Sequence, residues 1–141
     1  MNIKYVERIP TANEYNILTD SVGWGIREES IVEEAFKNTL YSLCAYDGDK
    51  LIGYGRLIGD RTIFIYIHDI MVIPEYQGNN IGTEIMNKLL EQINEYKKAN
   101  PDIRTYLGAS KGKESFYEKF GFVSRPTEDL GAGMILKGYN D

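Results

Sequence analysis

A short turn rich in glycine and asparagine joins a long β-branched run to a long amphipathic helix. The run covers residues 62–72, the turn is Gln77-Gly78-Asn79-Asn80-Ile81-Gly82-Thr83, and the helix begins near Ile81. Glycine and asparagine tolerate the left-handed backbone that a tight turn needs. The first N–H groups of a helix lack intrahelical partners and lie at the positive end of its dipole. The pattern therefore predicts a strand, a turn and a helix N-terminus that can bind an anion such as phosphate.

The composition indicates one folded domain spanning residues 1–141. Hydrophobic residues make up 43% and charged residues 26%, as is usual for a folded protein with one core. The formal net charge of −5 argues against a nucleic-acid partner, because such binding needs clustered Lys and Arg. The N-terminus lacks the apolar segment of a signal peptide and no stretch is long enough to span a bilayer, so we expect no membrane partner and a cytoplasmic location. Cys44, the only cysteine, lies in an apolar run, where we expect a buried, unreactive thiol rather than a nucleophile.

Local patterns predict how strands and helices follow one another. Strands are expected at residues 3–8, 40–46, 51–58, 62–72, 103–107, 121–123 and 133–137, and helices at 11–22, 30–38, 81–100 and 114–120. Capping boxes at residues 11–14 and 30–33 are expected to start the first two helices. A strand–helix–strand crossover should place residues 103–107 parallel to residues 62–72. We therefore expect an α/β chain of the α+β type, with a mixed, mostly antiparallel sheet of six to seven strands and helices on both faces.

Two motifs follow one another along the chain. The first is Gln77-Gly78-Asn79-Asn80-Ile81-Gly82, and the second is Phe116-Tyr117-Glu118-Lys119-Phe120-Gly121-Phe122. They resemble the acyl-CoA signature Arg/Gln-x-x-Gly-x-Gly/Ala and the Phe-Tyr-x-x-x-Gly-Phe pattern of the GCN5-related N-acetyltransferase (GNAT) superfamily. Asn80 stands where the family usually has its first glycine, and Ser110 and Lys113 stand where members often have Asn and Ala. The order of the expected elements resembles that of the family over nearly the whole chain.

The resemblance implies the acyl-CoA N-acyltransferase fold and an enzyme that transfers an acetyl group from acetyl-CoA to a primary amine. The acceptor would be a small molecule or an exposed peptide group, attacking the thioester directly, with no metal. Two alternatives stay open, a non-catalytic module that binds acyl-CoA and a transferase for a longer acyl group. A homodimer is also implied, because relatives often dimerise through their last strands.

The resemblance also implies which residues hold the cofactor. The N–H groups of the turn would face the pyrophosphate, and a backbone N–H near Ile70 to Val72 would face the thioester oxygen. The residues expected to contact acetyl-CoA are Ile70, Met71, Val72, Gln77, Gly78, Asn79, Asn80, Ile81, Gly82, Thr83, Ser110 and Tyr117.

Three residues are candidates for proton transfer. Tyr117 is expected to act as general acid toward the CoA sulfur, because a phenol is protonated at neutral pH. The alternative is a tyrosine of the core. His68, the only histidine, and Asp69 are candidates for the general base, and alternation along a strand predicts that their side chains point to opposite faces. A structural polar pair at the end of a strand is the alternative.

Trp24 is expected to contact the acceptor. It lies between Gly23 and Gly25 in a region that lines the acceptor site in the family, and it could form an aromatic wall or a mobile lid. A packing plug is the alternative. The nearby Glu28 and Glu29 would suit a cationic amine, although exposed helix caps often carry such residues.

Overall fold

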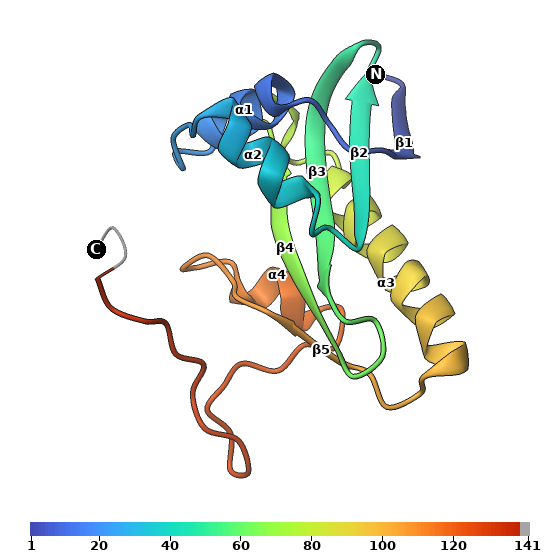
Figure 1. Cartoon of the computed structure of the whole chain (residues 1–141), viewed down its shortest axis with the longest axis vertical. Helices are drawn as coiled ribbons and strands as arrows, with labels where there is room; N and C mark the ends of the chain where they lie inside the picture. The colour runs from blue at the N-terminus through green and yellow to red at the C-terminus, as the bar shows by residue number, and fades with distance from the viewer. Residues whose placement is uncertain (139–141) are drawn as a thin grey trace. The chain divides into compact units, whose positions relative to one another are not determined.

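A five-stranded sheet organises the first of the two units into which the chain divides in the computed structural model (Figure 1). The structure describes residues 1–138, and the units are Met1–Leu107 and the remainder of the chain from Gly108. The strands are β1 (Ile3–Glu7), β2 (Tyr41–Asp47), β3 (Lys50–Gly59), β4 (Phe64–Val72) and β5 (Arg104–Leu107). They lie in chain order across the sheet, with β4 and β5 parallel and all other neighbours antiparallel. The expected mixed sheet and its parallel crossover are confirmed.

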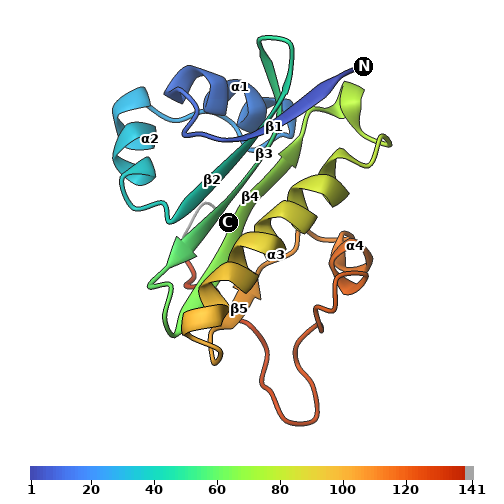
Figure 2. The ribbon, with the colours of Figure 1, turned by 90° about the vertical axis from the view of Figure 1, so that its right-hand side faces the viewer.

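Helices cover both faces of this sheet, as expected (Figure 2). The helices α1 (Ala12–Ser21) and α2 (Glu29–Phe36) lie on one face, where the ring of Tyr54 from β3 contacts rings from both helices. The helix α3 (Ile81–Ala99) lies on the other, where its apolar stripe of Ile81, Ile85, Leu89 and Ile93 is buried. None of the described helices is long and apolar enough to cross a membrane.

The start of α1 follows the sequence pattern and the start of α2 does not. The Thr11 hydroxyl accepts a hydrogen bond from the Glu14 N–H and the Glu14 carboxylate accepts one from the Thr11 N–H, so the first capping box is confirmed. The expected box at residues 30–33 is wrong, because α2 begins at Glu29 with no side-chain cap. The side chain of Asn16 binds both the N–H and the carbonyl of Arg27, at 3.1 and 2.8 Å, and so fixes the chain just ahead of α2.

The expected strand at 62–72 starts two residues late. One carboxylate oxygen of Asp60 accepts hydrogen bonds from the backbone N–H groups of Thr62, Ile63 and Phe64 at 2.7–2.9 Å. Thr62 and Ile63 belong to this turn, and β4 begins at Phe64.

The second unit contains the helix α4 (Glu114–Glu118), and no strand is found in its described residues. The strands expected at 121–123 and 133–137 are therefore wrong, and the sheet has five strands rather than six or seven. Met134, Ile135 and Leu136 are 95%, 77% and 88% exposed. An apolar run becomes a strand only by pairing with a neighbour, and its composition alone does not supply that neighbour. Whether residues 1–141 form a single domain stays a prediction.

Candidate active site

A β-bulge interrupts β4 at Asp69 and Ile70. Arg56 of β3 pairs with His68 and Tyr54 pairs with Met71, so Gly55 alone faces the two residues between them. Asp69 adopts a φ of 60°, in the left-handed region that aspartate enters more readily than most residues. A bulge adds one residue to a strand and shifts the alternation of its side chains.

The bulge turns the side chains of His68 and Asp69 to the same face of the sheet. Nδ1 of His68 lies 3.0 Å from a carboxylate oxygen of Asp69, and Asp69 also binds Tyr15 of α1. The expectation that these neighbours point to opposite faces is therefore wrong, because it assumed an unbroken two-residue period. The structure brings the two candidate bases together as a pair.

Asp69 is buried and His68 is accessible. The Asp69 side chain is 2% exposed, and its second oxygen accepts hydrogen bonds from Nε of Arg56 at 2.8 Å and from the Tyr15 hydroxyl at 3.0 Å. Burial alone would raise the pKa of Asp69, but the hydrogen bond and charge of His68, together with the charge of Arg56, lower it below its ordinary value. The His68 side chain is 48% exposed. A substrate can therefore reach the imidazole, while the carboxylate is already occupied.

Arg56 and Tyr15 belong to this cluster and were missed in the sequence. The guanidinium of Arg56 lies 5.5 Å from the ring centroid of Phe36, and its Nη1 donates to the Thr39 hydroxyl at 3.0 Å. One signal was present, since Arg56 interrupts an otherwise apolar run at 51–58 and a charge in the core requires a partner. No such signal distinguished Tyr15 from the ten other tyrosines.

The turn before α3 has the backbone that its residue types predict. Gly78 has a φ of 83° and Asn80, the N-cap residue, has a φ of 62°. The side chain of Gln77 donates to the carbonyl of Val72 at 2.9 Å, and that of Asn79 donates to the carbonyl of Tyr76 at 3.0 Å. These two side chains stabilise the turn itself.

The first turn of α3 has free hydrogen-bond donors. Among residues 1–138, no acceptor binds the backbone N–H groups of Ile81, Gly82 and Thr83. The Asn80 side chain makes no cap hydrogen bond to them. Three free donors at the positive end of a 19-residue helix suit the pyrophosphate that the sequence predicted here.

The end of β4 has an open edge in the first unit. The pairing of β4 with β5 runs from Phe64 opposite Arg104 to Ile67 opposite Leu107 and stops there. Beyond it, within Met1–Leu107, residues 68–72 of β4 pair with β3 alone. This edge includes Ile70, Met71 and Val72, where a ligand carbonyl could bind the strand. The bulge, the open edge and the turn before α3 therefore lie along one continuous segment of chain.

Ser110 and Tyr117 belong to the second unit, and their part in binding acetyl-CoA stays a prediction. Tyr117 packs edge-on against Phe116 and Phe122, with ring centroids 5.0 and 6.4 Å away. Burial raises the pKa of Tyr117 above its ordinary value, so its phenol stays protonated at neutral pH. That state is the one a general acid requires.

Trp24 lies in a turn whose two glycines have positive φ angles, 85° at Gly23 and 78° at Gly25. Its backbone N–H donates to the carbonyl of Thr19 at 2.8 Å, which anchors the turn to α1. The residue is 47% exposed, so its ring is accessible to a ligand. A role in binding the acceptor stays a prediction.

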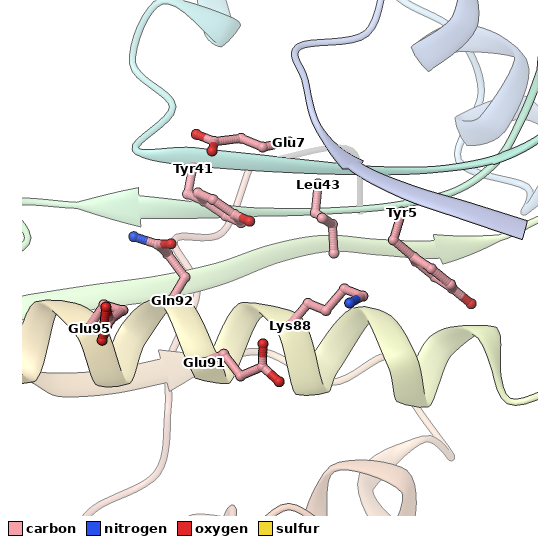
Figure 3. A pocket seen from close by; sticks show the side chains of 8 residues that line it. All are labelled: Tyr5, Glu7, Tyr41, Leu43, Lys88, Glu91, Gln92 and Glu95. Atoms are coloured by element: carbon pink, nitrogen blue, oxygen red, sulfur yellow. The ribbon is translucent and has the colours of Figure 1, made fainter.

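A groove of about 270 Å³ lies near the opposite edge of the sheet, between β1, β2 and α3 (Figure 3). It is lined by Tyr5, Glu7, Tyr41, Leu43, Lys88, Glu91, Gln92 and Glu95. It contains none of the predicted site residues, and the ammonium of Lys88 lies 5.6 Å from the ring centroid of Tyr5 within it. The groove is on the α3 face, whereas His68 and Asp69 face α1. We therefore separate it from the candidate active site.

Across residues 1–138, no group of three His, Cys, Asp or Glu side chains is placed to hold a metal ion.

Comparison with known sequences gives the family. Residues 25–136 match the family model of the acetyltransferase (GNAT) domain. The ycf52-like uncharacterized N-acetyltransferase of Prochlorococcus marinus is 33% identical over 117 residues, which cover 80% of this chain and 63% of the relative. The ycf52 uncharacterized N-acetyltransferase of Pyropia yezoensis is 30% identical over 129 residues, covering 86% and 71%. The chain thus spans just under two thirds of the Prochlorococcus protein.

Solved structures agree with this assignment. A probable acetyltransferase of unknown function from meticillin-resistant Staphylococcus aureus is 33% identical, with a TM-score of 0.85 over 96% of this chain and 99% of that one. A GNAT family protein of Streptococcus pneumoniae TIGR4 is 25% identical, with a TM-score of 0.79 over 98% and 100%. The resemblance found in the two sequence motifs is thereby confirmed, and this chain belongs to the GNAT acetyltransferase family.

Proposed function

We propose that the protein is an N-acetyltransferase that transfers the acetyl group of acetyl-CoA to a primary amine of a small molecule or of an exposed peptide. Membership of the GNAT family supports the reaction class. The observation that carries the proposal is the open edge of β4 at residues 68–72, followed in the chain by a helix with free N–H donors. The open edge offers hydrogen bonds to an extended thioester arm, and the free N–H groups offer hydrogen bonds to a pyrophosphate.

The residues of the chain fit acetyl-CoA in two places. The free N–H groups of Ile81, Gly82 and Thr83 would bind the pyrophosphate. A backbone donor on the open edge near Ile70 would bind the thioester oxygen, and one such donor is worth about 3 kcal/mol of transition-state stabilisation in other enzymes. When bound, acetyl-CoA supplies an activated acetyl group.

His68 is the proposed general base. A primary amine is mostly protonated at neutral pH and must lose a proton before its nitrogen can bond to the acetyl carbon. The accessible imidazole can take that proton directly or through one water. Bonding of the nitrogen to the acetyl carbon places negative charge on the thioester oxygen, and the C–S bond then breaks. Tyr117 would give its proton to the departing thiolate, and the second proton that the nitrogen loses on becoming an amide would restore the phenol through solvent.

The test is release of free CoA, followed with a thiol reagent over a panel of primary amines and peptides. The protein contributes little background, because Cys44 is fully buried and burial raises the pKa of its thiol to about 12. We expect acetyl-CoA to raise the melting temperature and at least one amine class to release CoA. Stabilisation by acetyl-CoA without turnover on any amine would instead identify a binding module. A rate that increases with acyl chain length would identify a longer acyl donor.

A further inference from the structure

We propose that Arg56 and Tyr15 are positioning residues that hold Asp69 as the acceptor for Nδ1–H of His68, which leaves Nε2 of His68 free to take a proton. That Nε2 takes its proton from a substrate amine rests on the proposed function. The hydrogen-bonding state of the imidazole does not, and it can be measured with no substrate present.

The state of the His68 ring follows from its contact with Asp69. An ionised carboxylate can only accept hydrogen bonds, so at the 3.0 Å contact Nδ1 of His68 must be the donor. In a neutral imidazole one nitrogen carries the proton and the other accepts, which assigns the acceptor role to Nε2. The ring also packs against that of Tyr66, with centroids 5.9 Å apart, so it has a fixed neighbour.

Asp69 acts in this way only while it stays ionised. A buried carboxyl without partners becomes neutral, and a neutral carboxylic acid can itself donate a proton to Nδ1. Arg56 and Tyr15 prevent this by donating two hydrogen bonds to the oxygen that His68 does not use. The three donors come from β4, β3 and α1, so the carboxylate is held from three elements.

Arg56 is itself held in place. Its Nη1 binds the Thr39 hydroxyl at 3.0 Å and contacts the carbonyl of Ala35 at 3.5 Å, while Phe36 lies beneath the guanidinium. An arginine can make these contacts together with the bond to Asp69 because its donors form a planar fork, whereas lysine offers a single ammonium. The orientation of His68 therefore depends on residues in and just after α2, which do not touch the imidazole.

The experiment is ¹⁵N NMR of the imidazole, with the pH raised until the ring signals no longer change, so that the neutral ring is the form observed. His68 is the only histidine, so in a chain without a histidine tag the ring signals need no assignment. We expect the wild-type ring to be the Nδ1–H form. Asp69→Asn should change it to the Nε2–H form, because the amide can donate to Nδ1. Arg56→Met and Tyr15→Phe should each increase the Nε2–H population, and Arg56→Lys should restore part of the Nδ1–H form.

The matched control is Tyr54→Phe. It also removes one buried hydroxyl, which binds Ser42 at 2.6 Å, and its ring lies beside that of Tyr15. Because Tyr54 donates to neither Asp69 nor His68 in the structure, its loss should leave the tautomer unchanged. A control that changes the tautomer as much as Tyr15→Phe would show general loosening of the core and overturn the assignment.

Two further results would overturn the inference. The first is a wild-type ring in the Nε2–H form, a result that does not depend on whether any variant folds. The second is an Asp69→Asn ring still in the Nδ1–H form.

With an amine that is turned over, Asp69→Asn should lower kcat about 100-fold or more, as expected for a misdirected base. If the Nδ1–H form and its response to the variants are found but no amine is acetylated, the positioning stands and the proposed function fails. Turnover with a wild-type ring in the Nε2–H form would reject the inference alone.

Discussion

Tyr117 can be tested by removing a single oxygen atom. Burial keeps its phenol protonated, and in α4 its ring is already packed against Phe116 and Phe122, so Tyr117→Phe removes the proton and keeps the packing. We expect kcat for CoA release to fall about 100-fold, with little change in the melting temperature, because general acids contribute at least that factor.

The matched control for this prediction is Tyr106→Phe, a tyrosine of β5 that is 37% exposed. Its rate should equal that of the wild type. An unchanged rate in Tyr117→Phe would remove Tyr117 from the mechanism and leave it as a packing residue.

At the residue scale the sequence indicated candidate site residues but not how their side chains are oriented. His68 and Asp69 were identified by their types and their place before the turn. Their pairing depends on the left-handed backbone at Asp69, which no two-residue period predicts. The contacts from Arg56 and Tyr15 join residues 13 and 54 positions away from Asp69, so only the folded chain brings them together.

The turn before α3 allows a test of backbone conformation at Asn80. Its φ of 62° is accessible to glycine without strain, tolerated by asparagine and strongly disfavoured for a β-branched residue. We expect Asn80→Gly to bind acetyl-CoA at least as tightly as the wild type. Asn80→Val should bind it at least several-fold more weakly, because the left-handed conformation costs about 1–2 kcal/mol in a β-branched residue, whose side chain cannot offset it by local hydrogen bonding as that of asparagine can. Titration calorimetry measures both affinities.

Asn94→Val is the control for this pair, since Asn94 is an exposed residue within α3. It makes the same chemical change in a helical backbone and should leave the affinity unchanged. Equal affinities for Asn80→Val and the wild type would mean that the turn can bind acetyl-CoA without the left-handed residue.

The contact between β3 and α3 gives a second prediction for an element. A Cβ added to Gly55 would lie 2.8 Å from Cδ1 of Ile70, 2.9 Å from Cγ2 of Ile85 and 3.0 Å from Cδ1 of Leu89. Ile85 and Leu89 are fully buried, so these side chains have little room to move. We expect Gly55→Ala to lower the free energy of unfolding by about 1–3 kcal/mol, measured in urea.

Gly131→Ala tests whether the effect comes from crowding. A Cβ at Gly131 would meet no atom within 4 Å, and stability should stay within about 0.5 kcal/mol of the wild type. A Gly55→Ala protein as stable as the wild type would show that α3 can shift away from the sheet.

At the scale of elements, local sequence patterns predicted most of the first unit. The five strands, the three long helices and the α1 capping box were found where apolar periods and cap residues placed them, within a few residues. Apart from the late start of β4, which a local turn at Asp60 sets, the errors arose where contacts more distant in sequence decide the structure. Asn16 sets the approach to α2, and residues 121–123 and 133–137 have the composition of strands without a strand partner.

For the whole molecule, acid stability follows from carboxylates with lowered pKa values. Hydrogen bonds from the backbone N–H groups of Phe64, Ile63 and Thr62 lower the pKa of Asp60 to about 2, compared with about 3.9 in an unfolded chain. A lowered folded-state pKa contributes stability that is present above the unfolded value and is lost as the pH falls through the folded value. The contribution of Asp60 should therefore disappear between about pH 4 and pH 2.

Chemical unfolding from pH 6 to pH 2 checks this, with Asp60→Asn as the comparison. The amide oxygen of the variant can still accept the three hydrogen bonds, but it carries no charge to titrate. We expect the difference in unfolding free energy between the two proteins to shrink as the pH falls from 4 to 2. Two curves that stay parallel over this window would mean that Asp60 does not couple stability to pH.

The bulge in β4 also determines which changes of chain length this strand can tolerate. Met71 shares the face of its partner Tyr54, toward α1, while Ile70 lies on the α3 face beside Gly55. Deleting Asp69 would remove the extra residue of the bulge, so Gly55 would face Ile70 alone and the strand would return to simple alternation with every later residue still on its present face. Ile70 would still face α3 and Met71 would still face α1, so the turn before α3 would begin from a strand in its present orientation. A one-residue deletion at this position is thus expected to keep the pairing of β4 with β3 and to remove only the carboxylate that binds His68, Arg56 and Tyr15.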